Sequence, residues 1–303
     1  MSIVRKYNIY QVDAFTKDLF EGNPAGVVIP ADGLTEQDMK LIARELNNSE
    51  TAFVFSSQDP SYDVQVRFFT PMLEVPICGH ATIAAHYVRA CEQQMDSCVV
   101  IQKTRVGLLP IEVIREQNDY SIVMTQGKIS FNNPFSPAIQ AEIVSALGLL
   151  DEELDKQCPL QIISTGHSKI MIGIKRNETL NRIQPDLFRL KELSKKVDCN
   201  GYFVFTLEKI EEGLVHGRMF APAIGITEDP VTGNANGPLG AYLVQHKLVR
   251  PVGDTFAFTG IQGEALGRPG KIRVIVSIKN GLPEKIKIAG NAIIVFKTEI
   301  NLK

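Results

Sequence analysis

The feature that most constrains this chain of 303 residues is a segment that occurs twice. The first copy, RFFTPMLEVPICGHATIAAHYV, spans residues 67–88, and the second, RMFAPAIGITEDPVTGNANGPLGAYLV, spans residues 218–244. Each copy reads as a strand that ends in Arg-x-Phe-x-Pro, a loop, and a Gly-x-Ala turn that opens an apolar helix. Such an internal echo indicates that one structural unit is used twice.

Two weaker echoes lie in the same order at similar offsets. The triplets Phe53-Val54-Phe55 and Phe203-Val204-Phe205 each follow a predicted helix and a polar turn. Residues 21–24, before the apolar run 25–29, are similar in placement to residues 165–168, before the run 169–173. With the triplets aligned, Glu50 faces Asn200. Three ordered echoes predict two similar halves, a pseudo-twofold pair rather than a solenoid.

The pattern of elements predicts an α+β fold. The length suits two domains, and 44% apolar with 22% charged residues are globular values. Short strands alternate with two main helices in each half, which favours a sheet curled around the half's most apolar helix, HATIAAHYV or PLGAYLV. We expect the chain to cross between the domains within residues 116–135.

Composition excludes several classes of function. The formal net charge of −2 gives no electrostatic footprint for nucleic acid or an anionic membrane. No apolar run approaches the ~18 residues of a membrane span, and the N-terminus reads as an alternating strand rather than a signal peptide. The cysteines are scattered, odd in number and without CxxC pairs, so we expect reduced thiols in a cytoplasmic protein. They are Cys78, Cys91, Cys98, Cys158 and Cys199.

The two Gly-x-Ala turns are candidate binding sites. Free N–H groups at a helix start, with the positive end of the dipole, suit a carboxylate or phosphate. Ordinary helix capping is the alternative for either turn alone, but the pairing favours function. Clefts between domains are common ligand sites, so we expect both turns to face one cleft. The turns are Gly79-His80-Ala81 and Gly233-Asn234-Ala235.

Proton transfer is the chemistry that the nearby titratable residues suggest. Glu50, His80 and Asp229 supply two carboxylates and an imidazole, which suffice for acid/base catalysis around one cleft. Taken singly, each has a structural alternative: a solvated turn, a helix cap and an Asp-Pro turn. Cys78 precedes a helix start, so it is either a thiol of lowered pKa or a small buried hydrophobe. His167 is either catalytic or a turn residue.

Cofactor motifs do not occur in the chain. There is no GxxxxGK[ST], and no GxGxxG follows a predicted strand. His80 and His86 are spaced so that they point to different sides of a helix and cannot share a metal. We therefore expect neither a metal nor an organic cofactor.

Three stretches resemble the signatures of the phenazine-biosynthesis PhzF-like isomerase family: SETAF (49–53), FTPMLEVPICGHAT (69–82) and EDPVTGNANG (228–237). The start of the chain and IQGEALGRPG (261–270) match as well, so the resemblance covers nearly the whole chain, closest to an uncharacterised branch. It implies the diaminopimelate epimerase-like fold, two pseudosymmetric domains with the active site between them. The implied domains are residues 1–118 with 290–303, and residues 119–289.

The resemblance also implies roles for individual residues. Glu50 matches the acid/base, and His80 and Asp229 match its polar partners. Ser49, Gly79, Ala81, Gly233 and Asn234 fall among the substrate-binding positions, the glycines as backbone donors. The phenazine enzyme moves a proton between carbons of a dihydro-hydroxyanthranilate without metal, pyridoxal phosphate or redox cofactor.

Two departures from the family patterns alter what is expected. Cys78 resembles one thiol of the two-thiol epimerases, but residues 229–233 hold no cysteine, so a two-thiol racemase is not supported. Asn234 stands where the phenazine enzyme has a serine, so the substrate contacts differ. The expectation is a racemase/epimerase-like isomerase acting on a small amino or hydroxy carboxylate, and a homodimer as is common in the family. Two alternatives stay open: a non-catalytic ligand- or protein-binding member, and an enzyme that uses Cys78 as one base.

Overall fold

The computed structural model describes residues 5–302 and divides them into two compact units. The first unit holds the residues up to Thr125 and those from Ala289 onward, and the second holds Gln126–Ile288. The expected boundary after residue 118 lies too early. The strand β8 (Asp119–Thr125) pairs antiparallel with β7 (Gly107–Glu116), so a hairpin keeps it in the first unit.

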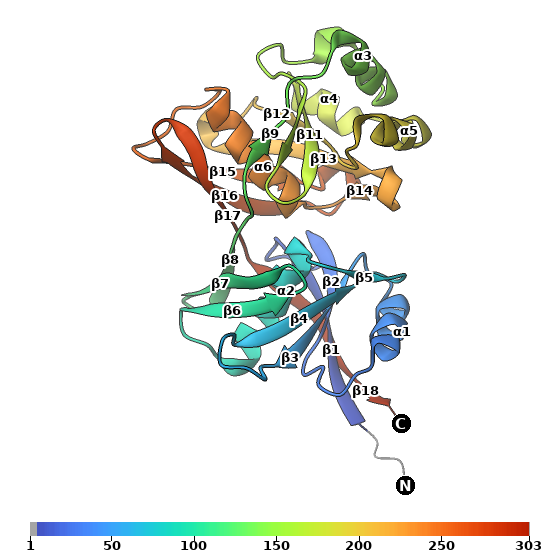
Figure 1. Ribbon diagram of the computed structural model, residues 1–303, viewed down its shortest axis with the longest axis vertical. Coiled ribbons are helices and arrows are strands. Elements are labelled where there is room, and N and C mark those ends of the chain that lie inside the picture. The colour runs from blue at the N-terminus through green and yellow to red at the C-terminus, as the bar shows by residue number, and fades with distance from the viewer. Residues whose placement is uncertain (1–4, 303) are drawn as a thin grey trace. The chain divides into compact units, whose positions relative to one another are not determined.

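The elements follow one another as Figure 1 labels them. The first unit contains β1 (Arg5–Ala14), β2 (Asn23–Val28), α1 (Glu36–Leu46), β3 (Thr51–Ser56), β4 (Val64–Phe69), β5 (Glu74–Val75), α2 (Gly79–Gln93), β6 (Cys98–Thr104), β7, β8 and β18 (Ala292–Leu302). The second contains β9 (Ser130–Phe131), α3 (Pro137–Ala146), η1 (Asp151–Glu153), β10 (Gln161–Ser164), β11 (Ser168–Ile174), α4 (Asn177–Arg182), α5 (Leu187–Val197), β12 (Tyr202–Thr206), η2 (Ile210–Glu212), β13 (Leu214–Ala221), η3 (Pro222–Ile224), β14 (Ile226–Asp229), α6 (Gly233–Gln245), β15 (Thr255–Gln262), η4 (Glu264–Leu266) and β16 (Gly270–Lys279). The strand β17 (Leu282–Gly290) carries the chain back to the first unit, where β18 lies antiparallel along β1.

The two units have the same strand topology. In the first, β2 is parallel to β3, β3 is antiparallel to β4, and β4 is antiparallel to β5 but parallel to β6, which turns back into β7. In the second, β11, β12, β13, β14, β15 and β16 repeat these pairings in the same order and sense. The repeated segment of the sequence is therefore a repeated fold unit.

The strand register corrects one detail of the sequence alignment. Phe53 pairs with Arg67 in the first unit, and Val204 pairs with Arg218 in the second. The Phe-Val-Phe triplets are thus one residue out of structural register. Because successive strand residues point to opposite faces, this shift matters. Glu50 corresponds to Gly201, not to Asn200.

One helix forms the centre of each unit. The helix α2 packs against β1, β2, β3 and β8, and α6 packs against β10, β11, β15 and β16 (Figure 1). Most residues of both helices are buried, and both helices are rich in alanine or glycine. Small residues are needed because a Cβ on Gly240 would lie 2.8 Å from the side chains of Val274 and Val276. The expected sheet around an apolar helix is confirmed.

The Arg-x-Phe echo encodes a duplicated ion pair. The Arg67 guanidinium donates to both carboxylate oxygens of Glu74 at 2.9 and 2.8 Å, and Arg218 donates in the same way to Glu228 at 2.8 and 2.7 Å. Each guanidinium also lies over the phenylalanine two residues further along. A bidentate pair fixes both groups, so each clamps the loop that leads to its central helix.

The helix predicted from the Thr35 signal forms as α1. Thr35 accepts a hydrogen bond from the Asp38 N–H while the Asp38 carboxylate accepts from the Thr35 N–H, which completes a capping box. Among the described residues, none of the helices combines the length and the apolar character that crossing a lipid bilayer requires.

Candidate active site

The first cluster of site residues lies where β3 begins beside the start of α2. Ser49 and Glu50 occupy the short connection between α1 and β3, and Cys78 is the residue from which α2 begins. His80 is the second residue of that helix. Pairing of β3 with β2 and β4 holds the connection against the helix start, so the two signatures SETAF and CGHAT meet in space.

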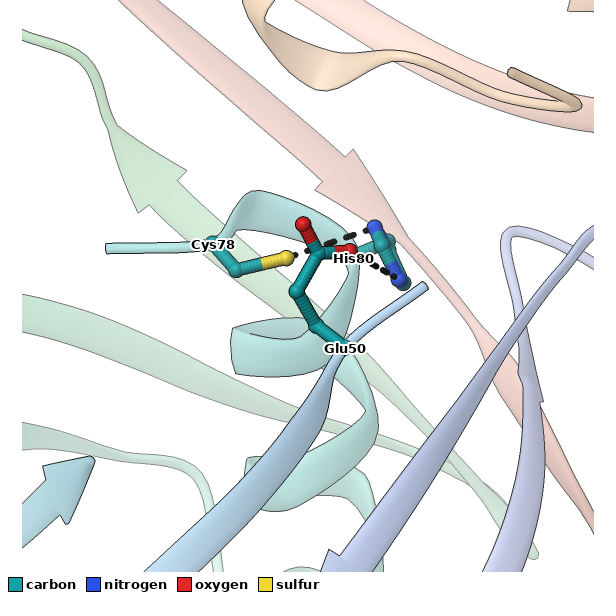
Figure 2. Close-up of side chains that lie close together, drawn as sticks. All are labelled: Glu50, Cys78 and His80. Carbon is teal, nitrogen blue, oxygen red and sulfur yellow. Dashed lines mark hydrogen bonds and ion pairs between the residues drawn. The ribbon is translucent and has the colours of Figure 1, made fainter. Parts of the chain in front are cut away.

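The His80 imidazole is the centre of this cluster (Figure 2). Its Nε2 lies 3.5 Å from Glu50 Oε2 and 3.3 Å from Ser49 Oγ, and its Nδ1 lies 3.4 Å from Cys78 Sγ. His80 is buried, and the Glu50 side chain is 16% exposed. The ring therefore links a carboxylate to a thiol, and Glu50 keeps a face on which a substrate proton could be received.

The start of α2 is suited to an anion. Cys78 is extended (φ −143°, ψ 124°), and its side chain makes no capping hydrogen bond, while its carbonyl accepts one from Thr82 Oγ1 at 2.7 Å. A Cβ placed on Gly79 would have no described atom within 4 Å. The amides of the first turn, Gly79 to Ala81, thus stand at a helix end that can accept an acidic group.

The second cluster surrounds the start of α6 in the second unit. Asp229 ends β14, and its Oδ2 accepts a hydrogen bond of 2.5 Å from the Thr232 hydroxyl. Gln262 donates to the Asp229 carbonyl at 2.6 Å and to Thr232 Oγ1 at 3.0 Å, and its Oε1 accepts from the Thr232 N–H at 3.1 Å. Asp229 is 9% exposed. Its carboxylate and the loop are therefore held rigidly.

The first turn of α6 is irregular. Asn234 has φ −81° and ψ 15°, which departs from helical geometry, and the Gly233 carbonyl accepts a hydrogen bond of 2.8 Å from Gln126 Nε2. A close approach explains one glycine here, since a Cβ on Gly237 would lie 1.9 Å from Gln126 Oε1. The amides around Gly233 are thereby set by a side chain from outside the helix.

The two helix starts correspond position by position. Thr232 takes the place of Cys78, and Asn234 takes the place of His80, as expected from the sequence. At the same distance along each helix, a side chain bonds back to the first carbonyl: Thr82 to Cys78, and Asn236 to Thr232 at 3.0 Å. The second helix start carries a hydroxyl instead of a thiol, which is the arrangement expected of a chain that is not a two-thiol racemase.

The predicted residues fall into two groups. Ser49, Glu50, Gly79, His80 and Ala81 are together in the first unit, and Asp229, Gly233 and Asn234 are together in the second. That both groups face one substrate stays a prediction. His167 lies in the exposed turn between β10 and β11. Sequence reasoning missed Gln262, whose signal was the matching stretch IQGEALGRPG (261–270).

Sequence reasoning also missed a possible metal-ligating set. Glu50, Cys78 and His80 each offer one ligand atom, and these atoms lie within 4.8 Å of one another. Carboxylate, thiolate and imidazole are ligands that Zn²⁺ accepts. Because Glu50 lies in a different segment from Cys78 and His80, the spacing of residues along one helix does not reveal this set.

Two similar units, each with a sheet around one buried helix and polar groups at its start, define the epimerase-like class of α+β folds. A solved hydroxyproline epimerase from Agrobacterium vitis has this fold, with a TM-score of 0.66 at 12% identity, covering 98% of this chain and 93% of that one. The fold expected from the sequence is confirmed.

This chain belongs to the phenazine biosynthesis-like (PhzC-PhzF) family, whose model matches residues 12–298. An uncharacterised isomerase from Clostridium acetobutylicum is 56% identical, over 99% of this chain and all of the relative. A solved PhzF-family phenazine biosynthesis protein from Bacillus anthracis is 31% identical with a TM-score of 0.88, covering 98% and 99% of the two chains. These similarities support a general isomerase role.

Proposed function

We propose that this protein is a cofactor-independent isomerase that moves a proton on a small carboxylate, with Glu50 as the proton carrier. The observation that carries the proposal is the contact of 3.5 Å between Glu50 Oε2 and His80 Nε2 at the start of a buried helix. A base must lie within reach of the proton it takes and be held by a further group. Glu50 has such a group in His80.

The reaction begins when a carboxylate oxygen of Glu50 removes a proton from a carbon that a neighbouring carbonyl or carboxylate group has made acidic. The electron pair of that C–H bond moves toward the substrate's carbonyl oxygen, which gains negative charge. Preorganised N–H donors stabilise such charge, and the first-turn amides of α2 are donors of this kind. The protonated Glu50 then returns the proton to another carbon on the same face of the substrate.

One proton carrier is the simplest assignment for this chain. A racemase with two thiols would need a cysteine at both helix starts, and Thr232 occupies the second. In the proposal Asp229 and Asn234 orient the polar groups of the substrate. Because Asn234 replaces the serine of the phenazine enzyme, we propose an amino or hydroxy acid rather than the phenazine precursor as substrate.

The test is solvent exchange. The protein is incubated in D₂O with amino, hydroxy and cyclohexadienyl carboxylates, and the masses of the recovered compounds are measured by mass spectrometry. Glu50→Gln keeps the shape of the side chain but cannot accept the proton, so we expect exchange to be lost while binding remains measurable. Glu45→Gln, on the exposed side of α1, is the matched control and should exchange normally.

Each outcome assigns a role. A compound that gains one mass unit with the wild type and with Glu45→Gln, but not with Glu50→Gln, identifies the reaction class and the substrate together. Normal exchange by Glu50→Gln would contradict the assignment of the base. Absence of exchange with every compound would favour a ligand-binding role for the same site.

A further inference from the structure

Lys169 is a buried lysine that the proposed reaction does not yet use. It lies near the start of β11 and is 8% exposed. Within residues 5–302 its Nζ has one hydrogen bond in the structure, to the backbone carbonyl of Ser168 at 3.1 Å. An ammonium group has three donors, and a buried cation is costly unless it is paired. Two donors are thus left for another acceptor.

The duplicated fold places Lys169 at a meaningful position. Gly26 pairs with Thr51 in the first unit, and Ile170 pairs with Tyr202 in the second. One residue earlier along each strand, Ala25 beside Glu50 corresponds to Lys169 beside Gly201. In the first unit the larger side chain of the pair is Glu50, at the start of β3, whereas in the second unit it is Lys169, on β11. Where the first unit presents a carboxylate, the second presents an ammonium.

Contacts around Gly201 support this exchange of position. A Cβ added to Gly201 would lie 2.3 Å from Lys169 Cδ, 2.8 Å from Cε and 3.3 Å from Nζ. The stem of Lys169 therefore fills the space that the Glu50 side chain enters at the equivalent position of the first unit. A larger residue at 201 would therefore have to push the lysine side chain aside.

The electrostatic surroundings of Lys169 leave its charge partly uncompensated. Burial lowers the pKa of the Lys169 ammonium, while the nearby Cys199 and Asp229 act in the opposite direction. Arg218, the other buried lysine or arginine described in the second unit, by contrast uses four of its five N–H donors on Glu228 and two backbone carbonyls. Of these two cations, Lys169 keeps the larger share of its donors for a ligand.

We propose that Lys169 binds the anionic group of the substrate, so that the second unit selects carboxylates at the position where the first unit carries its proton-transferring carboxylate. This inference rests on the proposed function for the identity of the ligand. The inference adds Lys169 to the proposed site as a residue that determines specificity. Lys169 and the amides at the start of α6 would share the substrate's carboxylate.

The test compares acids with their neutral amides. Benzoate and benzamide, 2-aminobenzoate and 2-aminobenzamide, and proline and prolinamide are titrated into the full-length protein by calorimetry. We expect the wild type to prefer at least one acid over its amide. In Lys169→Met the affinity for that acid should fall about 10- to 100-fold, as for a lost charge-assisted hydrogen bond, while the affinity for the amide is unchanged.

Lys175→Met is the matched control. Lys175 follows β11 and also donates to one backbone carbonyl, that of Glu152, but it is exposed. It should leave the preference for the acid intact. A second variant, Gly201→Ala, keeps the lysine but displaces it and should weaken the same preference. If Lys169→Met does not fold, Gly201→Ala carries the test.

The inference is overturned if the wild type prefers none of the acids, or if Lys169→Met retains the preference. Failure of the proposed function is a separate result. A Lys169-dependent preference without any deuterium exchange would retain this binding role and reject the isomerase. Exchange that depends on Glu50, with acid binding indifferent to Lys169, would retain the isomerase and reject this inference.

Discussion

Replacement of Arg218 by methionine should be among the most destabilising changes in the chain. The Arg218 and Glu228 side chains are 8% and 9% exposed, and two hydrogen bonds of 2.8 and 2.7 Å join them. Arg218 Nη1 also donates to the carbonyls of Leu180 and Ile183 at 3.0 and 2.9 Å. Methionine would leave a buried carboxylate and two carbonyls without this donor, which costs about 3–5 kcal/mol.

The duplicated fold supplies an internal comparison. Arg67 makes the same bidentate pair with Glu74, but its side chain is 24% exposed, and Glu36 lies 3.4 Å from it. Water can reach this pair, so we expect Arg67→Met to cost only about 1–2 kcal/mol. Against a typical unfolding free energy of roughly 5–15 kcal/mol, the two variants should differ clearly.

The assay is equilibrium unfolding in urea. The chain contains no tryptophan, so far-ultraviolet circular dichroism is the suitable signal, and the midpoint and slope are compared between variants. The double variant Arg218→Met, Glu228→Met should recover part of the loss, because the buried charge is gone while the carbonyls of Leu180 and Ile183 still lack their donor. The reasoning is refuted if Arg218→Met costs no more than Arg67→Met, or if the double variant is as unstable as the single one.

Two further predictions concern His86 in the middle of α2 and Cys78, from which α2 begins. Burial, and then the charge of Arg89, lowers the pKa of His86 to about 3. Between that pH and about 6.5, His86 binds a proton in the unfolded chain but stays neutral in the folded one. The free energy of unfolding should therefore fall as the pH drops below about 6.5, by about 2 kcal/mol at pH 5. Urea midpoints between pH 5 and 8 should show a shallower acid loss in His86→Gln, and equal pH dependence would contradict the shift. If Glu50 is the proton carrier, Cys78→Ser should keep exchange within about tenfold of wild type; complete loss in the D₂O assay would instead make the Cys78 thiol a base.

The central elements of the fold were accessible from sequence because their signals are local. The capping residue Thr35 fixes the start of α1, and small apolar residues mark the two helices that become enclosed. The repeated Arg-x-Phe-x-Pro segment identified the two halves. The structure brings Glu50 and His80 to within 3.5 Å of each other, and each belongs to a short motif that could be recognised in the sequence.

What only the tertiary structure decided is the register between segments far apart in the chain. Strand pairing assigns Glu50 to Gly201 rather than Asn200, since hydrogen bonds between strands, and not the likeness of two Phe-Val-Phe triplets, fix which residues are equivalent. The same register brings Lys169 over Gly201. A buried lysine has no local signature in sequence: its burial and its partners are properties of the strands packed around it.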